Sequence, residues 1–268
     1  MRIDLEAIKI QMMMWYWLLR NVDMNIIQDG VQFDKWKELI SNESVFCIGD
    51  SHVNFFGGNE ELNFQKIGLE GINFCGAQVR PFIPLHLGPV LAYNAAKMGG
   101  VNHCMEKVIF LMDNVFYNGA QVLCSFGEID IRVHVWNRVY DRDFKSVIDD
   151  IIDHYLCLIS VLKKKYRLII WGPVASQKDE WFNNPNYPRS GTERERNIAT
   201  HYFNTRLESI CKSMNITFIS IFSELIDEKY CTKEYYISDE CHLSQRAWSI
   251  AAPKFRDKGI RVDCYEEY

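Results

Sequence analysis

Residues 45–52 of this 268-residue chain read Val-Phe-Cys-Ile-Gly-Asp-Ser-His. The first four, Val45–Ile48, form an apolar run without polar alternation, which is typical of a strand that is buried on both faces. The polar residues Asp50, Ser51 and His52 follow directly after Gly49. Open α/β sheets bind their ligands at the carboxyl ends of the strands, so the sequence predicts that these three residues border a binding site.

Four further apolar runs have the length of a strand, and helical patterns lie between them. The runs are Ile72–Val79, Val122–Phe126, Leu168–Trp171 and Ile216–Ile221. The helical patterns cover Gln32–Ile40, Asp143–Lys165, Thr192–Met214 and Ser244–Phe255. Strands that alternate with helices predict a parallel sheet between two layers of helices, which is an α/β sandwich of three layers.

The composition is that of an ordinary globular protein, with 48% hydrophobic and 24% charged residues. The net charge of −5 argues against nucleic acid as a partner, because a nucleic-acid-binding protein presents a basic face. The nine cysteines include no C-x-x-C pair, and we interpret them as buried thiols. Such thiols favour a reducing, cytoplasmic location.

The N-terminal part of the chain carries its longest apolar run, Met12–Leu19. The run is too short for a membrane span, which needs about 18–20 residues. It also lacks the features of a signal peptide, because Asp4 and Glu6 precede it and no A-x-A site follows. We expect residues 1–42 to form a helical segment packed on the domain or on a second copy of the chain, and residues 43–268 to form one α/β domain.

A second motif, Asp239-Glu240-Cys241-His242, precedes the last helical pattern. A carboxylate three residues before a histidine can bind one ring nitrogen and fix the tautomer, which leaves the other nitrogen free to act as a base. A serine after the first strand and this Asp/His pair before the last helix are therefore candidates for one catalytic site.

These two motifs together resemble those of the SGNH (GDSL-type) hydrolase superfamily. The resemblance covers Gly49-Asp50-Ser51 and Asp239-x-x-His242 and runs from about Val45 to Lys258. It implies a flavodoxin-like sheet of five parallel strands in the order 2-1-3-4-5. It also implies that Ser51 is the nucleophile, His242 the general base and Asp239 its orienting partner, with no cofactor and no metal.

The block from Gly127 to Arg132, Gly-Glu-Ile-Asp-Ile-Arg, departs from the family pattern Gly-x-Asn-Asp. The asparagine of that pattern helps to hold the oxyanion, whereas Ile129 at this position cannot donate a hydrogen bond. A G-E-I-D-x-R version resembles a subgroup of the superfamily. The charged residues Glu128, Asp130 and Arg132 either pair with one another or bind substrate, and Arg132 is the cation that could replace the asparagine.

The family's other oxyanion donors are backbone N–H groups. One belongs to Ser51, and the other to a glycine after the second strand, which is either Gly76 or Gly88. We favour Gly88, because the strand should run to about Phe82.

The predicted function is that of an acyl-ester hydrolase or an O-acyltransferase that uses Ser51. The substrate expected from the resemblance is an O-acetylated carbohydrate, and the long loop Gly172–Gly191 offers Trp181, Phe182 and Tyr187 for stacking on a sugar. Two alternatives stay open. One is an inactive SGNH-like domain that binds a glycan. The other is a metal-dependent phosphoesterase with Asp130, His134, Asp239 and His242 as metal ligands.

Overall fold

The structure is a computed structural model, and it describes residues 26–140 and 142–263. The apolar run Met12–Leu19, together with the contact to a second copy that we expect of it, lies outside the described residues. No helix within the described part of the chain is long and apolar enough to cross a bilayer.

The fold is α/β, as predicted, and its centre is one mixed sheet of seven strands in the order β2-β3-β4-β1-β5-β6-β7. Five neighbouring strands run parallel: β4 (Phe82–His86), β1 (Val45–Gly49), β5 (Gln121–Ser125), β6 (Arg167–Trp171) and β7 (Thr217–Ile219). Two short strands, β2 (Gln65–Lys66) and β3 (Asn73–Phe74), extend the sheet beyond β4 in antiparallel orientation. The sheet is therefore mixed and has seven strands, not five parallel strands alone as predicted, but its five parallel strands stand in the predicted order 2-1-3-4-5.

The predicted strand Ile72–Val79 is also wrong, because only the two residues of β3 in it belong to the sheet. The strand that pairs with β1 is β4, in which His86 lies opposite Gly49. Pro84 stands in the middle of β4, and a proline normally argues against an interior strand because it has no N–H. Its carbonyl oxygen still accepts the N–H of Cys75 at 3.0 Å.

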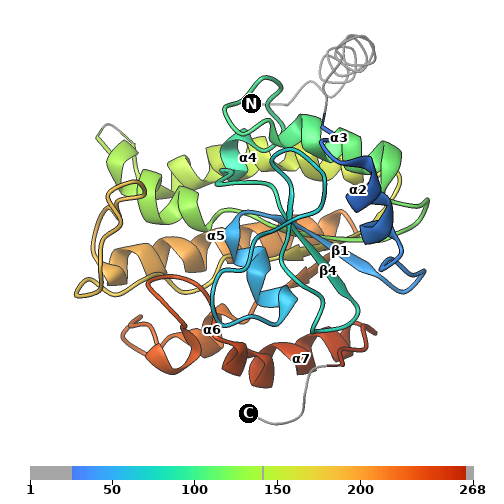
Figure 1. Ribbon diagram of the computed structural model, residues 1–268. Helices are drawn as coiled ribbons and strands as arrows, with labels where there is room; N and C mark the ends of the chain where they lie inside the picture. Colours follow the sequence, from blue (N-terminus) through green and yellow to red (C-terminus); the bar gives the residue numbers. More distant parts are fainter. Residues whose placement is uncertain (1–25, 141, 264–268) are drawn as a thin grey trace.

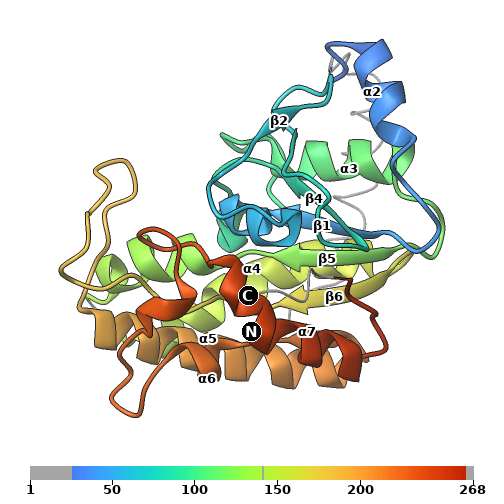
Figure 2. The ribbon, with the colours of Figure 1, turned by 60° about the horizontal axis from the view of Figure 1, so that its bottom comes forward.

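Helices cover both faces of the sheet (Figures 1 and 2). One face carries α2 (Gly30–Lys37), α3 (Cys104–Asn114), α4 (Phe144–Leu162) and α5 (Glu193–Ser213). The other carries the short 3₁₀ helix η1 (Ser51–Gly57), α6 (Phe222–Leu225) and α7 (Trp248–Asp257).

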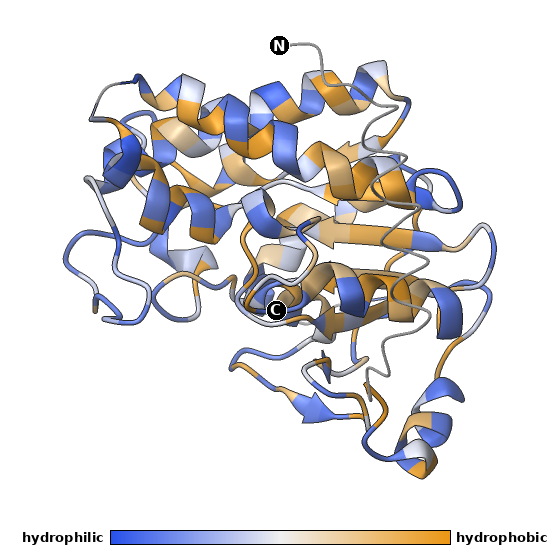
Figure 3. Cartoon of the chain, turned by 90° about the horizontal axis from the view of Figure 1, so that it is seen from above, coloured by the Kyte–Doolittle hydropathy of each residue, from blue (hydrophilic) through white to orange (hydrophobic). Residues whose placement is uncertain are grey.

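The alternation along β1 shows why its sequence is apolar throughout. Phe46 and Ile48 pack into the first core, and Val45 and Cys47 pack into the second. Figure 3 shows that the central strands of the sheet are hydrophobic, whereas the helices carry both hydrophobic and hydrophilic residues. The eight cysteines of the described residues are free thiols, and six of them are buried.

Candidate active site

Ser51 is the first residue of η1 and follows the tight turn at Asp50 that ends β1. The carboxylate of Asp50 accepts the backbone N–H of His52 at 3.0 Å and thereby begins η1. Gly49 ends the strand at a close approach, since a Cβ atom there would lie 2.1 Å from the carbonyl oxygen of Ser125. The sequence Gly-Asp-Ser therefore turns the chain and presents the serine at the carboxyl end of a central strand.

The structure brings Ser51, His242 and Asp239 together in one chain of hydrogen bonds. The Oγ atom of Ser51 lies 2.7 Å from Nε2 of His242, and Nδ1 of His242 lies 2.7 Å from Oδ2 of Asp239. The other oxygen of Asp239 accepts the backbone N–H groups of Cys241 and His242 at 2.9 and 2.8 Å. The three side chains thus have the arrangement that a serine nucleophile, its base and an orienting carboxylate require.

The proton positions follow from the state of Asp239. Partial burial raises the pKa of this carboxyl, but the hydrogen bond and charge of His242 and the two backbone N–H groups together hold it well below its usual range. An ionised carboxylate only accepts, so Nδ1 of His242 carries the ring proton. Nε2 is then left to accept the hydroxyl proton of Ser51.

The backbone N–H groups of Ser51 and Gly88 were predicted as oxyanion donors, and both lie near the end of β1. The N–H of Leu87 binds the carbonyl oxygen of Gly49 at 2.9 Å, which brings Gly88 next to the turn that carries Ser51. Gly88 has a φ of +103°, a conformation that favours glycine. Within residues 26–140 and 142–263, the N–H groups of Ser51 and Gly88 donate to no other group, so both are free to bind a substrate oxygen.

Arg132 forms an ion pair instead of facing Ser51. It lies in η3 (Asp130–Val135), a π-helical turn that follows β5. Its Nε and Nη2 atoms donate to the two oxygens of Glu128 at 2.6 and 3.1 Å, and Nη1 donates to the carbonyl oxygen of Tyr187 at 2.8 Å. All three guanidinium nitrogens thus have a hydrogen-bond partner. The sequence analysis left two roles open for Arg132, and the structure shows the pairing with another charged residue.

Asp130 has a separate role and does not pair with Arg132. Its carboxylate accepts the backbone N–H groups of Ala92 and Tyr93 at 2.7 and 3.2 Å. Burial raises the pKa of Asp130 to about 7. The residue therefore ties η3 to the segment that follows Gly88.

His52 is a residue to which the sequence analysis gave no role, although it stands next to Ser51. Its side chain is buried, its Nε2 atom lies 3.2 Å from Oε2 of Glu128, and its ring centre lies 4.8 Å from that of His242. Burial disfavours the charged ring, but the carboxylate of Asp50 and the contacts with Cys241 and Glu128 raise the pKa of His52 to about 10. His52 and Arg132 thus both lie against the Glu128 carboxylate.

The metal ligands of the phosphoesterase alternative do not converge. Among the described residues, the single group of three or more side chains that are close enough to share a metal ion consists of His52, Cys241 and His242. Asp130 is engaged with backbone N–H groups, and His134 belongs to no such group. The predicted four-residue set is therefore wrong.

The loop from Gly172 to Gly191 contains no helix or strand, as predicted, and stands out from the body in Figure 2. It is fixed to η3, since the N–H of Ser190 binds the carbonyl oxygen of Arg132 at 2.8 Å. Arg189 braces it from within by donating to the carbonyl oxygen of Trp181 at 2.7 Å. Phe182 remains 63% exposed at its surface.

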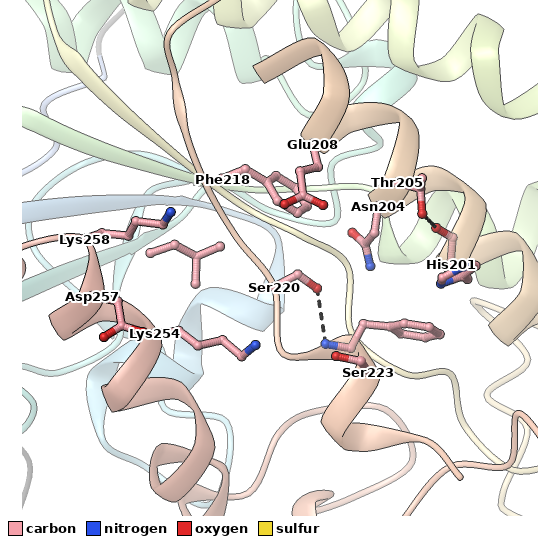
Figure 4. Close-up of a pocket in the computed structure, with 12 residues that line it drawn as sticks. His201, Asn204, Thr205, Glu208, Phe218, Ser220, Ser223, Lys254, Asp257 and Lys258 are labelled. Atoms are coloured by element: carbon pink, nitrogen blue, oxygen red, sulfur yellow. Dashed lines mark hydrogen bonds between the residues drawn. The ribbon is translucent and has the colours of Figure 1, made fainter. Parts of the chain in front are cut away.

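A separate cavity of about 390 Å³ lies at the free edge of β7, between α5 and α7 (Figure 4). Its lining includes Asn204, Phe218, Ser220 and Lys254 but no member of the triad. Lys254 pairs with Glu224 at 2.7 Å, and the amide of Asn204 donates to the carbonyl oxygen of Pro173 at 2.9 Å. The cavity is therefore separate from the site around Ser51.

Comparison with known proteins finds similarity in structure alone. No family model and no curated protein matches the sequence. A solved structure of a proposed platelet activating factor from Streptococcus pneumonia is 15% identical with a TM-score of 0.51, over 91% of this chain and 98% of that one. This similarity shows a shared fold.

Two further solved structures have lower TM-scores. A GDSL-like lipase from Bacteroides thetaiotaomicron is 13% identical over 87% of this chain and 97% of that one, with a TM-score of 0.47. A catalytic mutant of an acetylxylan esterase from Geobacillus stearothermophilus is 15% identical over 82% and 96%, with a TM-score of 0.46.

Proposed function

We propose that this chain is a serine-dependent ester hydrolase or O-acyltransferase that acts on O-acetyl groups of a carbohydrate. The observation that carries the proposal is the hydrogen-bonded chain from Ser51 through His242 to Asp239, with both links at 2.7 Å. A domain that only binds a glycan has no need of this arrangement.

The reaction follows from the positions of the donors and acceptors. The Oγ atom of Ser51 attacks the acyl carbon while its proton passes to Nε2 of His242. The negative charge that develops on the carbonyl oxygen is stabilised by the N–H groups of Ser51 and Gly88. Collapse of this intermediate expels the alcohol, which takes the proton back from His242, and leaves an acyl-serine.

The second half of the reaction decides between hydrolysis and transfer. Water or a sugar hydroxyl gives its proton to His242 and attacks the acyl carbon, and the bond to Ser51 then breaks as the Oγ atom takes that proton back from His242. Asp239 stays ionised throughout and stabilises the imidazolium of His242. Ile129 supplies no third oxyanion donor, and one such donor is worth about 10²–10³ in kcat. We therefore expect a slower enzyme than one with three donors.

The carbohydrate part of the proposal is supported by the loop Gly172–Gly191. Its Phe182 side chain is exposed, and the loop also carries Trp181 and Tyr187. Flat aromatic faces of this kind stack on the apolar faces of sugar rings.

The test is release of acetate from O-acetylated oligosaccharides and from p-nitrophenyl acetate. We expect the wild-type protein to release acetate and the Ser51→Ala variant to release none, with stability changed by at most about 1 kcal/mol. Ser223→Ala, at the cavity beside β7, is the matched control and should keep full activity. Tight binding of the glycan without any release of acetate would instead favour an inactive binding domain.

A further inference from the structure

The turn that carries the catalytic base also gathers two other side chains that can bind metal ions. His52, Cys241 and His242 each offer one ligand atom, and these atoms lie within 4.8 Å of one another. Imidazole nitrogen and thiolate sulfur are both ligand types that bind Zn²⁺. The three residues come from two segments, η1 and the turn before α7, which the fold brings together at the carboxyl end of β1.

The spacing on the His242 side suits a tetrahedral ion. Zn–S and Zn–N bonds of about 2.3 and 2.05 Å place sulfur and nitrogen about 3.6 Å apart in such a site. The Sγ atom of Cys241 lies 3.7 Å from Nδ1 of His242. Oδ2 of Asp239 lies 2.7 Å from the same nitrogen and could supply a fourth ligand.

His52 provides an independent indication of a ligand. Its side chain is 6% exposed, and neither ring nitrogen has a hydrogen-bond partner among the described residues. The carboxylate of Glu128 is close enough for a charge contact at 3.2 Å, but it is not aligned for a hydrogen bond. A buried ring nitrogen without a partner is costly, and coordination to a metal ion would satisfy it.

We propose that His52, Cys241 and Nδ1 of His242 form an inhibitory site for a thiophilic divalent cation such as Zn²⁺. This inference rests on the proposed function, because it assigns regulation to the proposed catalytic base. Binding forms bonds from the metal to two ring nitrogens and one sulfur, and it releases the proton of the Cys241 thiol and any proton on the coordinating nitrogen of His52.

Inhibition follows from the tautomer of His242. In the metal-free protein Nδ1 carries the proton and donates it to Asp239, so Nε2 accepts from Ser51. A metal ion on Nδ1 forces the remaining ring proton onto Nε2. The nitrogen that faces Ser51 then donates instead of accepting, and it cannot take the serine proton. Removal of the metal restores the base.

Binding is tested first in the Ser51→Ala variant, which keeps all three ligands and needs no activity. Zn²⁺ is titrated against a chromophoric chelator, and we expect one Zn²⁺ per chain to bind at the cluster. Adding Cys241→Ser or His52→Asn should weaken this binding at least tenfold. The matched control is Cys231→Ser, which changes a half-buried thiol outside the cluster. It should leave the affinity for Zn²⁺ unchanged. Cys241→Ala serves as a second variant if Cys241→Ser does not fold.

Activity is tested in the protein with Ser51 intact. Zn²⁺ should inhibit acetate release and EDTA should reverse the inhibition, while the activity of Cys241→Ser, measured against its own rate without metal, should resist Zn²⁺. Equal affinity in the Cys241 and Cys231 variants, or equal inhibition of both, would overturn the site. Zinc binding at the cluster in a protein without esterase activity would uphold the metal site and defeat the proposed function. An active esterase that does not bind zinc would uphold the proposed function and defeat the metal site.

Discussion

Among single residues, Asp239 and His242 are the pair on which the proposed proton transfer from Ser51 depends. Asp239→Asn removes the charge that fixes the ring proton on Nδ1, and His242→Ala removes the base itself. We expect each change to lower kcat by about 10³–10⁴, with the double variant hardly worse than either single one. The kcat values of the three variants are measured by steady-state kinetics. If the decrease in kcat of the double variant equals the product of the two single decreases, the two residues do not act as a unit.

Arg132 is expected to act on stability rather than on chemistry. Arg132→Ala leaves the buried Glu128 carboxylate without its arginine partner, and breaking a buried ion pair costs about 3–5 kcal/mol. Urea unfolding measures this loss, and Arg138→Ala is the exposed control on the same segment. A protein of normal stability whose kcat falls by about 10²–10³ would identify Arg132 as an oxyanion donor instead.

Asp130 makes the stability of the protein depend on pH. Its pKa is raised to about 7 by burial, whereas an unfolded aspartate titrates near about 3.9. The folded state therefore binds more protons between these values, so the contribution of Asp130 is full below about pH 4 and is lost as the pH rises through 7. We expect the stability of the wild type relative to Asp130→Asn to fall from pH 4 to pH 8 in urea titrations. A difference that stays constant or rises would be inconsistent with this burial effect.

At the scale of elements, the accuracy of the sequence predictions follows from burial and from helix-start signals. The strands β1, β5 and β6 agree with the predicted runs to within one residue at each end, because both faces are covered and the apolar run is continuous. The strand β4 was missed because Pro84 interrupts its pattern. The helix α3 was missed because His103, which precedes it, has a φ of +47° and provides no capping side chain.

In the proposed function, the loop Gly172–Gly191 is the element that contacts the sugar. Arg189 holds it by donating to the carbonyl oxygens of Asp179 and Trp181. We expect Arg189→Ala to raise KM for O-acetylated oligosaccharides several-fold, because the aromatic side chains lose their fixed positions, and to leave kcat/KM for p-nitrophenyl acetate nearly unchanged. An equal effect on both substrates would mean that the loop does not contact the sugar.

At the scale of the whole molecule, the site is assembled from distant parts of the chain. Ser51 and His242 are separated by 191 positions, and the sheet order places β4, β1 and β5 side by side so that their loops meet. The motifs predicted which residues would form the triad. The pairing of Arg132 with Glu128 and the place of His52 depend on side-chain directions that a motif does not encode.

Covalent labelling shows whether Ser51 is the nucleophile. The wild-type protein is treated with a fluorophosphonate, which reacts with serines activated by a neighbouring base, and the modified peptide is identified by mass spectrometry. We predict one modification per chain, on Ser51, and none in folded Ser51→Ala or His242→Ala protein. Labelling of another residue, or labelling that persists in Ser51→Ala, would mean that Ser51 is not the nucleophile.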